Sequence, residues 1–172
     1  MSVFSGQGVG FKRSRRRFEP AYVIITSPNL EIMNNISKSG GGSVYLFWVG
    51  LLNSGTGGAK NCVIEIEYHD STSEEYEYLG YAYYNKPDFN AHSESSVWLV
   101  RANYDQDAWQ TFIMLRDASG SSTSDFKTFS LLPGEYYFRL TMIADNATSS
   151  SKEIKVTVSP GDLELPKLET IP

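Results

Sequence analysis

Short apolar or aromatic runs recur along this chain, and none of them keeps a helical period for more than a turn or two. The clusters between them are dense in Gly, Ser, Asn, Asp and Pro, which are typical of turns. Eleven Tyr and nine Phe also favour strands over helices. The pattern predicts an all-β protein, and its spacing favours an antiparallel two-sheet sandwich over alternating strands and helices.

We expect about nine strands, each bounded by turn residues. Their ranges are 21–27, 43–52, 62–68, 76–84, 96–103, 110–116, 126–131, 135–144 and 152–158. The length of 172 residues suits one hydrophobic core. The expected organisation is a basic Gly/Ser/Arg arm at 1–19, a sandwich domain at 20–159 and an extended Pro/Leu tail at 160–172.

Alternation predicts which strand faces are buried. Between Cys62 and Tyr68 the even-numbered side chains are apolar or aromatic, while Glu65 and Glu67 point the other way. The segment 44–49 is apolar at every position, which indicates a central strand whose second face is covered by a terminal arm or a neighbouring subunit. The expected core includes Trp48, Ile64, Ile66, Tyr136, Phe138, Leu140 and Val156.

Charge is divided unevenly along the chain. Five basic residues lie in one six-residue run: Lys12, Arg13, Arg15, Arg16 and Arg17. The formal net charge is −5, and because this run contributes +5, the other residues carry −10. A basic arm on an acidic body predicts contact with a polyanion, and both nucleic acid and an acidic protein surface remain open as its partner.

Two further segments are candidate contact surfaces. The tail has prolines at 160, 166 and 172, and its Leu163, Leu165 and Leu168 predict an extended segment that lies along a partner or along the chain's own body. The run 76–84 is rich in tyrosine. Its Tyr76, Tyr78, Tyr81 and Tyr83 predict either a recognition surface for sugars, peptides or a partner subunit, or ordinary cross-strand packing.

Two segments resemble a known family. The strand at 44–52, the turn Asn53-Ser54-Gly55 and the alternating strand that follows resemble immunoglobulin-like cell-adhesion and CARDB-type modules, and the hairpin from Leu131 to Val158 is similar to their final hairpin. Tyr136 stands where such sandwiches place a tyrosine corner. The resemblance covers about 20–160 and implies a sandwich fold rather than one function. The chain lacks the paired cysteines of antibody domains, so antigen-receptor roles are not implied.

Catalytic and metal-binding motifs are weak. The single cysteine, Cys62, falls on an apolar strand face, where an inert buried thiol is the usual case, and one cysteine cannot form an intrachain disulfide. His69 and His92, each beside acidic residues, are more often solvated than metal ligands. We therefore expect no enzyme activity, no cofactor and no metal. Asn35 and Asn146 fit the glycan acceptor pattern, which the sequence leaves undecided.

Function follows from the arrangement of arm, body and tail. We expect a structural subunit of a virion or another protein shell, which contacts further copies or other structural subunits. Its arm would contact nucleic acid or an acidic neighbour. This layout resembles capsid proteins with sandwich folds and basic N-terminal arms. The alternative is an adhesion or ligand-binding module. Residues 1–20 lack the apolar block of a secretory signal, and the longest apolar stretch is about nine residues against roughly twenty for a spanning helix. We therefore expect synthesis in the cytoplasm and no transmembrane segment.

Overall fold

The structure is a computed structural model that describes residues 21–33, 43–82, 88–105, 108–116, 126–160 and 164–172. Predictions for the following residues lie outside this described part of the chain: Lys12, Arg13, Arg15, Arg16, Arg17, Asn35, Tyr83 and Leu163. Within it, no helix has the length and hydropathy that a membrane span requires.

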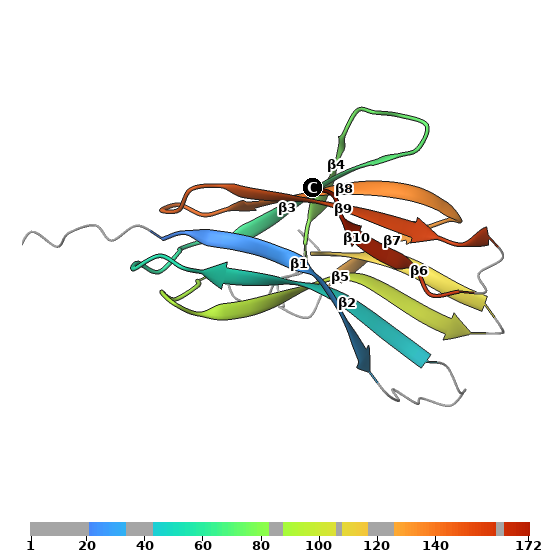
Figure 1. The fold of residues 1–172 in the computed structure, drawn as a ribbon, viewed down its shortest axis with the longest axis horizontal. Helices are drawn as coiled ribbons and strands as arrows, with labels where there is room; N and C mark the ends of the chain where they lie inside the picture. Colours follow the sequence, from blue (N-terminus) through green and yellow to red (C-terminus); the bar gives the residue numbers. More distant parts are fainter. Residues whose placement is uncertain (1–20, 34–42, 83–87, 106–107, 117–125, 161–163) are drawn as a thin grey trace, which may run out of the picture.

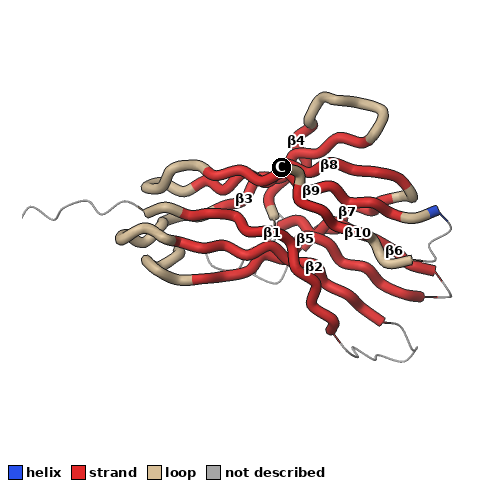
Figure 2. Tube along the Cα trace, viewed as in Figure 1, coloured by secondary structure: helices blue, strands red, loops and turns tan. Residues whose placement is uncertain are grey.

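The described residues form ten strands and no α-helix, and the loop that joins β3 to β4 stands out at the top of the view in Figure 2. The strands are β1 (Val23–Met33), β2 (Ser43–Asn53), β3 (Val63–Asp70), β4 (Glu77–Tyr81), β5 (Glu94–Asp105), β6 (Ala108–Arg116), β7 (Phe126–Leu131), β8 (Gly134–Ile143), β9 (Ser150–Val158) and β10 (Lys167–Thr170). They make two antiparallel five-stranded sheets in the orders β1-β2-β5-β6-β7 and β10-β9-β8-β3-β4 (Figure 1). The predicted all-β sandwich is confirmed.

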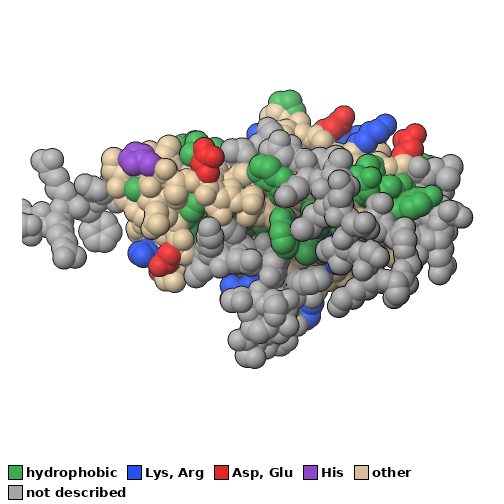
Figure 3. Space-filling view, turned by 90° about the horizontal axis from the view of Figure 1, so that it is seen from below, with side chains coloured by type: hydrophobic (Ala, Val, Ile, Leu, Met, Phe, Trp, Pro, Cys, Tyr) green, Lys and Arg blue, Asp and Glu red, His purple; other side chains and the backbone are tan. Residues whose placement is uncertain are grey.

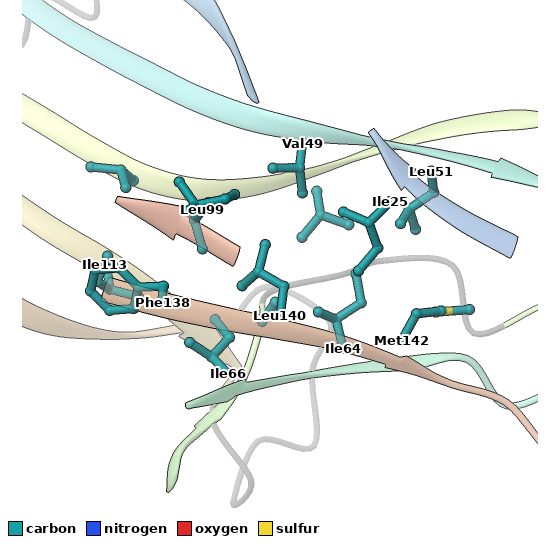
Figure 4. Packing of buried hydrophobic residues seen from close by; sticks show 14 of the residues in the cluster. Ile25, Val49, Leu51, Ile64, Ile66, Leu99, Ile113, Phe138, Leu140 and Met142 are labelled. Carbon is teal, nitrogen blue, oxygen red and sulfur yellow. The ribbon is translucent and has the colours of Figure 1, made fainter. Parts of the chain in front are cut away.

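The core lies between the two sheets, as the alternation predicts. Ile64 and Ile66 of β3 are buried, while Glu65 and Glu67 face outward and are only half-buried. Side chains from both sheets meet in one cluster (Figure 4). It includes Ile25, Val49, Leu51, Leu99 and Ile113 from one sheet and Ile64, Ile66, Phe138, Leu140 and Met142 from the other.

The prediction that Trp48 belongs to this core is wrong. Its neighbours Phe47 and Val49 are the buried residues that face the other sheet, so alternation turns Trp48 to the outward side of β2. The segment is apolar at every position, and its sequence pattern therefore could not select the inward set. β2 is an internal strand between β1 and β5, in agreement with the expectation of a central strand.

The tail forms a strand that the nine predicted ranges do not include. β10 pairs antiparallel with β9, with Leu168 opposite Val156, and both Leu165 and Leu168 pack against the core of the same chain. The described part of the tail therefore lies along its own body, which is one of the two expected arrangements. Binding of a partner by the tail stays a prediction.

Two side chains fix the turns at the ends of the sandwich. The Tyr136 hydroxyl donates to the backbone carbonyl of Leu132 at 3.0 Å, the bond of a tyrosine corner. Asn53 is fully buried, and its Oδ1 accepts from the backbone N–H groups of Tyr22 and Gly55 at 3.1 and 3.0 Å. Its Nδ2 donates to the carbonyls of Gly57, Phe89 and Asn90. The buried side-chain amide of Asn53 thus has all its hydrogen-bond partners, and these bonds connect three loops at one end of the sandwich.

Candidate binding surfaces

The outward side of the sheet β10-β9-β8-β3-β4 carries polar and aromatic side chains in rows that cross the strands. We call this surface the polar face. One row runs from His69 through Tyr137 and Lys155 to Glu169. The next row contains Tyr78, Glu67, Arg139 and Glu153, and a third begins with Tyr81, Glu65 and Thr141. Side chains directly opposite on neighbouring strands lie close enough to interact.

Arg139 is the centre of the second row. Its Nε donates to Glu153 Oε1 at 3.0 Å, and its Nη1 lies 3.7 Å from Glu67 Oε2. The guanidinium lies 3.8 Å from the ring centroid of Tyr76, a cation–π contact. Hydrogen bonding to Glu153 raises the pKa of Arg139, while burial and the charge of Glu153 raise the pKa of Tyr76. The surface therefore holds a guanidinium between two carboxylates and an aromatic ring.

The first row is built around stacked rings. His69 stacks on Tyr137 at 4.6 Å between ring centroids with an interplanar angle of 9°, and it meets Tyr76 edge-on at 4.6 Å. Lys155 Nζ lies 2.6 Å from Glu135 Oε1, which lowers the pKa of Glu135 and raises that of Lys155. Both rows are thus internally paired, which fixes the positions of the side chains.

The edge strand β4 adds an exposed tyrosine pair, Tyr78 and Tyr81. Their side chains are 58% and 37% exposed, and their ring centroids lie 6.0 Å apart at 80°. Burial and hydrogen bonding to Tyr81 raise the pKa of Tyr78. Simple alternation would place residues three apart on opposite faces. The register shifts between Ile66 and Glu67, and this irregularity brings both tyrosines to the outward side.

The structure brings three of the four predicted recognition tyrosines to one face. Tyr76 is half-buried beside Arg139, as packing would require, whereas the tyrosine pair is exposed, and recognition by this pair stays a prediction. The polar face also uses Tyr137 and Arg139, which the sequence did not single out, and His69, which the sequence suggested only as a weak metal ligand. Their signal is an odd-numbered position in β3 and β8, two strands whose buried residues are even-numbered.

The outward side of the other sheet carries large apolar side chains together with polar ones such as Arg101 and Gln110, and we call it the apolar face. Leu46 and Met114 face outward, yet each is at most 4% exposed and neither belongs to the core between the sheets. Leu46, Arg101 and Phe112 form one row across β2, β5 and β6. Trp48 lies opposite Trp98, and Ile24, 37% exposed, lies opposite Leu52. Figure 3 shows one side of the molecule, on which hydrophobic side chains reach the surface in several places.

A shallow depression opens at one end of the β6–β7 pair. Its volume is about 270 Å³, and its lining residues are Trp109, Gln110, Thr111, Phe112, Ser130, Leu131, Leu132 and Pro133. Leu132 is 72% exposed at its rim. The lining is mainly apolar and contains no charged side chain, so it offers packing area rather than a reactive group.

The candidate reactive residues are engaged in structural contacts. Cys62 is buried, and burial, with the charges of Asp88 and Asp145, raises its pKa to about 11, which disfavours the nucleophilic thiolate. The Asn146 side chain bonds the backbone of Lys60 and Gly58 at 2.8 and 2.7 Å. Across the described ranges, no three His, Cys, Asp or Glu side chains gather as they would around a metal ion.

Comparison with known proteins adds little to this geometry. No protein-family model matches the chain, and no curated protein matches it. A crystal structure of a Bordetella pertussis protein named as ApaA matches with 12% sequence identity, covering 90% of this chain and 97% of that chain, at a TM-score of 0.37. A likeness of this size supports no argument about fold or function, so the candidate surfaces are interpreted from their own chemistry.

Proposed function

We propose that this chain is a non-enzymatic structural subunit of a larger assembly, most fittingly a virion or another protein shell. The observation that carries the proposal is the apolar face. One sheet bears large apolar side chains on both sides, and only one side is needed for the sandwich core. Leu46 and Met114 are already covered within the chain, so the part of this side that is open to a partner lies around Tyr22 and Ile24, which are 52% and 37% exposed. Exposed apolar side chains outside the core are typical of protein contact regions.

The charge distribution supports the same proposal. The basic run at 12–17 precedes a body that carries most of the acidic residues. Copies of one chain that combine a basic segment with an acidic body attract one another in a head-to-tail manner. This arrangement resembles that of shell proteins with a sandwich domain and a basic arm, in which the arm contacts neighbours or nucleic acid.

Size-exclusion chromatography with light scattering tests the proposal on the full chain over a wide range of concentration. We expect multimers whose population grows with concentration. An Ile24→Asp change, which places a charge on the apolar face, is expected to reduce them. Leu132→Asp, at an apolar residue that is 72% exposed in the loop between β7 and β8, is expected to leave them unchanged. A chain that stays monomeric throughout contradicts the proposal.

The tyrosine pair favours a second candidate, an adhesion or ligand-binding module with an immunoglobulin-like sandwich. Exposed aromatic rings at a sheet edge suit sugars or peptides. In that case the full chain would be a stable monomer, and a glycan or peptide array would identify a ligand whose binding is lost on Tyr78→Ala.

A further inference from the structure

The tyrosine pair lies among carboxylates on the polar face. Tyr81 is opposite Glu65 and Tyr78 is opposite Glu67 in the β3–β4 register. Both rings are among the most exposed large apolar side chains in the described residues. The edge of this face therefore combines accessible ring surfaces with negative charge, the combination that favours a cation over an apolar or anionic ligand.

The same face already holds one guanidinium in this way. Arg139 lies 3.8 Å from the Tyr76 ring centroid while it contacts Glu153 at 3.0 Å and Glu67 at 3.7 Å. Arginine suits such a site better than lysine, because its planar group stacks on a ring while its N–H groups reach carboxylates. The tyrosine pair with Glu65 repeats these components one strand further out, where they are accessible.

We propose that the tyrosine pair and Glu65 form a docking surface for the arginine-rich segment 12–17 of a second copy of this chain. The proposal rests on the proposed function and deepens it by naming one contact of the assembly. Four of the five basic residues in that segment are arginines, so each can place a guanidinium on a ring and against a carboxylate.

Chain length favours a second copy over the chain's own segment. Ala21 bridges Ala147 in the loop between β8 and β9, whereas β4 lies two strands beyond β8. The row of Tyr78 is displaced from Ala21 by two strand spacings sideways and by roughly six residues along the strand. The distance between them is therefore more than about 20 Å. Arg17 precedes Ala21 by four residues and reaches about 14 Å. The backbone at Arg17 therefore cannot lie at its own tyrosine pair, whereas a second copy places no such limit on any residue of segment 12–17.

Charge also separates this partner from nucleic acid. Carboxylates beside the tyrosine pair repel phosphates, so the docking surface itself selects a cationic segment. A nucleic-acid partner would instead engage segment 12–17 directly and would leave the tyrosine pair without a role. The two arrangements predict different effects of substitutions on the polar face.

Complementation between two full-chain variants tests the docking. The face variant carries Tyr78→Ser and Tyr81→Ser, and the segment variant carries Ser at all five basic positions. We expect each change to weaken self-association about tenfold or more in sedimentation velocity at low salt. In an equimolar mixture, the intact segment of the face variant can dock on the intact face of the segment variant. The mixture is therefore expected to form a one-to-one complex that neither variant forms alone, and added salt should dissociate it.

A Leu132→Ser variant is the matched control, since it removes a side chain that is 72% exposed on another part of the surface, and it is expected to associate like the parent. Circular dichroism melting of the variants verifies that each one folds. If the parent assembles and the face variant assembles equally well, the docking is wrong and the proposed function stands. If the mixture forms no complex, or if only an added DNA duplex binds segment 12–17, the docking is also wrong. A monomeric parent overturns both proposals.

Discussion

The two sheets share one core but present different outward faces. On the polar face, Arg139 joins Glu67 and Glu153 in pairs that remain partly open to solvent. On the apolar face, the outward side chains of Leu46 and Met114 are nearly as buried as the core itself. Partly exposed ion pairs contribute little to the stability of the fold, whereas burial of apolar side chains such as Leu46 and Met114 stabilises it. The two outward faces therefore differ in how they stabilise the chain: the apolar face by burial, the polar face by ion pairs and ring contacts, and recognition by the polar face stays a proposal.

The largest expected effect comes from the core that both faces share. Ile66 is fully buried on β3, so Ile66→Ala should lower the free energy of unfolding by about 2 to 5 kcal/mol. Glu65→Ala, one residue away on the outward side, should change it by less than about 0.5 kcal/mol. Urea denaturation measures both values. Similar costs for the two variants would show that the faces of β3 are assigned wrongly.

The comparison between the outward faces is sharpest at Leu46. Because its side chain is 4% exposed, Leu46→Ala should cost about 2 kcal/mol or more in unfolding free energy, although it lies outside the inter-sheet core. Glu67→Ala occupies the equivalent outward position on the other sheet and should cost less than about 1 kcal/mol. Equal small costs would mean that the apolar face is not packed in the isolated chain.

A smaller effect is expected when the charged ladder is broken. Arg139→Gln removes the contacts to Glu67 and Glu153, but the Arg139 side chain is 38% exposed, so the loss should stay below about 1 kcal/mol. High salt should shrink the difference from the parent, as solvent-exposed ion pairs are screened. Arg116→Gln, at an exposed position on β6, is the control and should be neutral. A salt-independent loss would instead point to lost packing on Tyr76.

The smallest effect is a pH dependence confined to the polar face. Lys155 lowers the pKa of Glu135, so this carboxyl stabilises the fold above its unfolded pKa, and the contribution is lost as the pH falls through its lower folded value. The melting temperature of the parent should fall as the pH drops below about 4, the ordinary range of carboxyl groups. The melting temperature of Glu135→Gln should fall less over the same range. Leu46→Ala should keep the pH profile of the parent. If the parent and Glu135→Gln show the same dependence of melting temperature on pH, the Glu135–Lys155 pair is not the source of the pH dependence.

The strand content and most inward residues could be predicted from the sequence. Alternation is a local property of an extended backbone, so Ile64, Ile66 and Phe138 could be assigned without knowledge of their neighbours. The assignment failed at Trp48, because every residue of the segment 44–49 is apolar and the pattern does not show which residues face inward. The short strand β10 was not predicted, because four residues between prolines become a strand only when the edge of β9 pairs with them.

The candidate surfaces divide in the same way. The sequence alone determined that tyrosines gather at 76–83 and that basic charge gathers at 12–17, since composition is fixed by the chain. Only the tertiary structure decided that Tyr78 and Tyr81 share a face, because the register shift arises from pairing with β3. It also decided that Arg139 contacts Tyr76, because neither residue determines which strand lies next to the one that carries it. Local periodicity belongs to the backbone, whereas register and strand order depend on contacts between segments that are distant in the sequence.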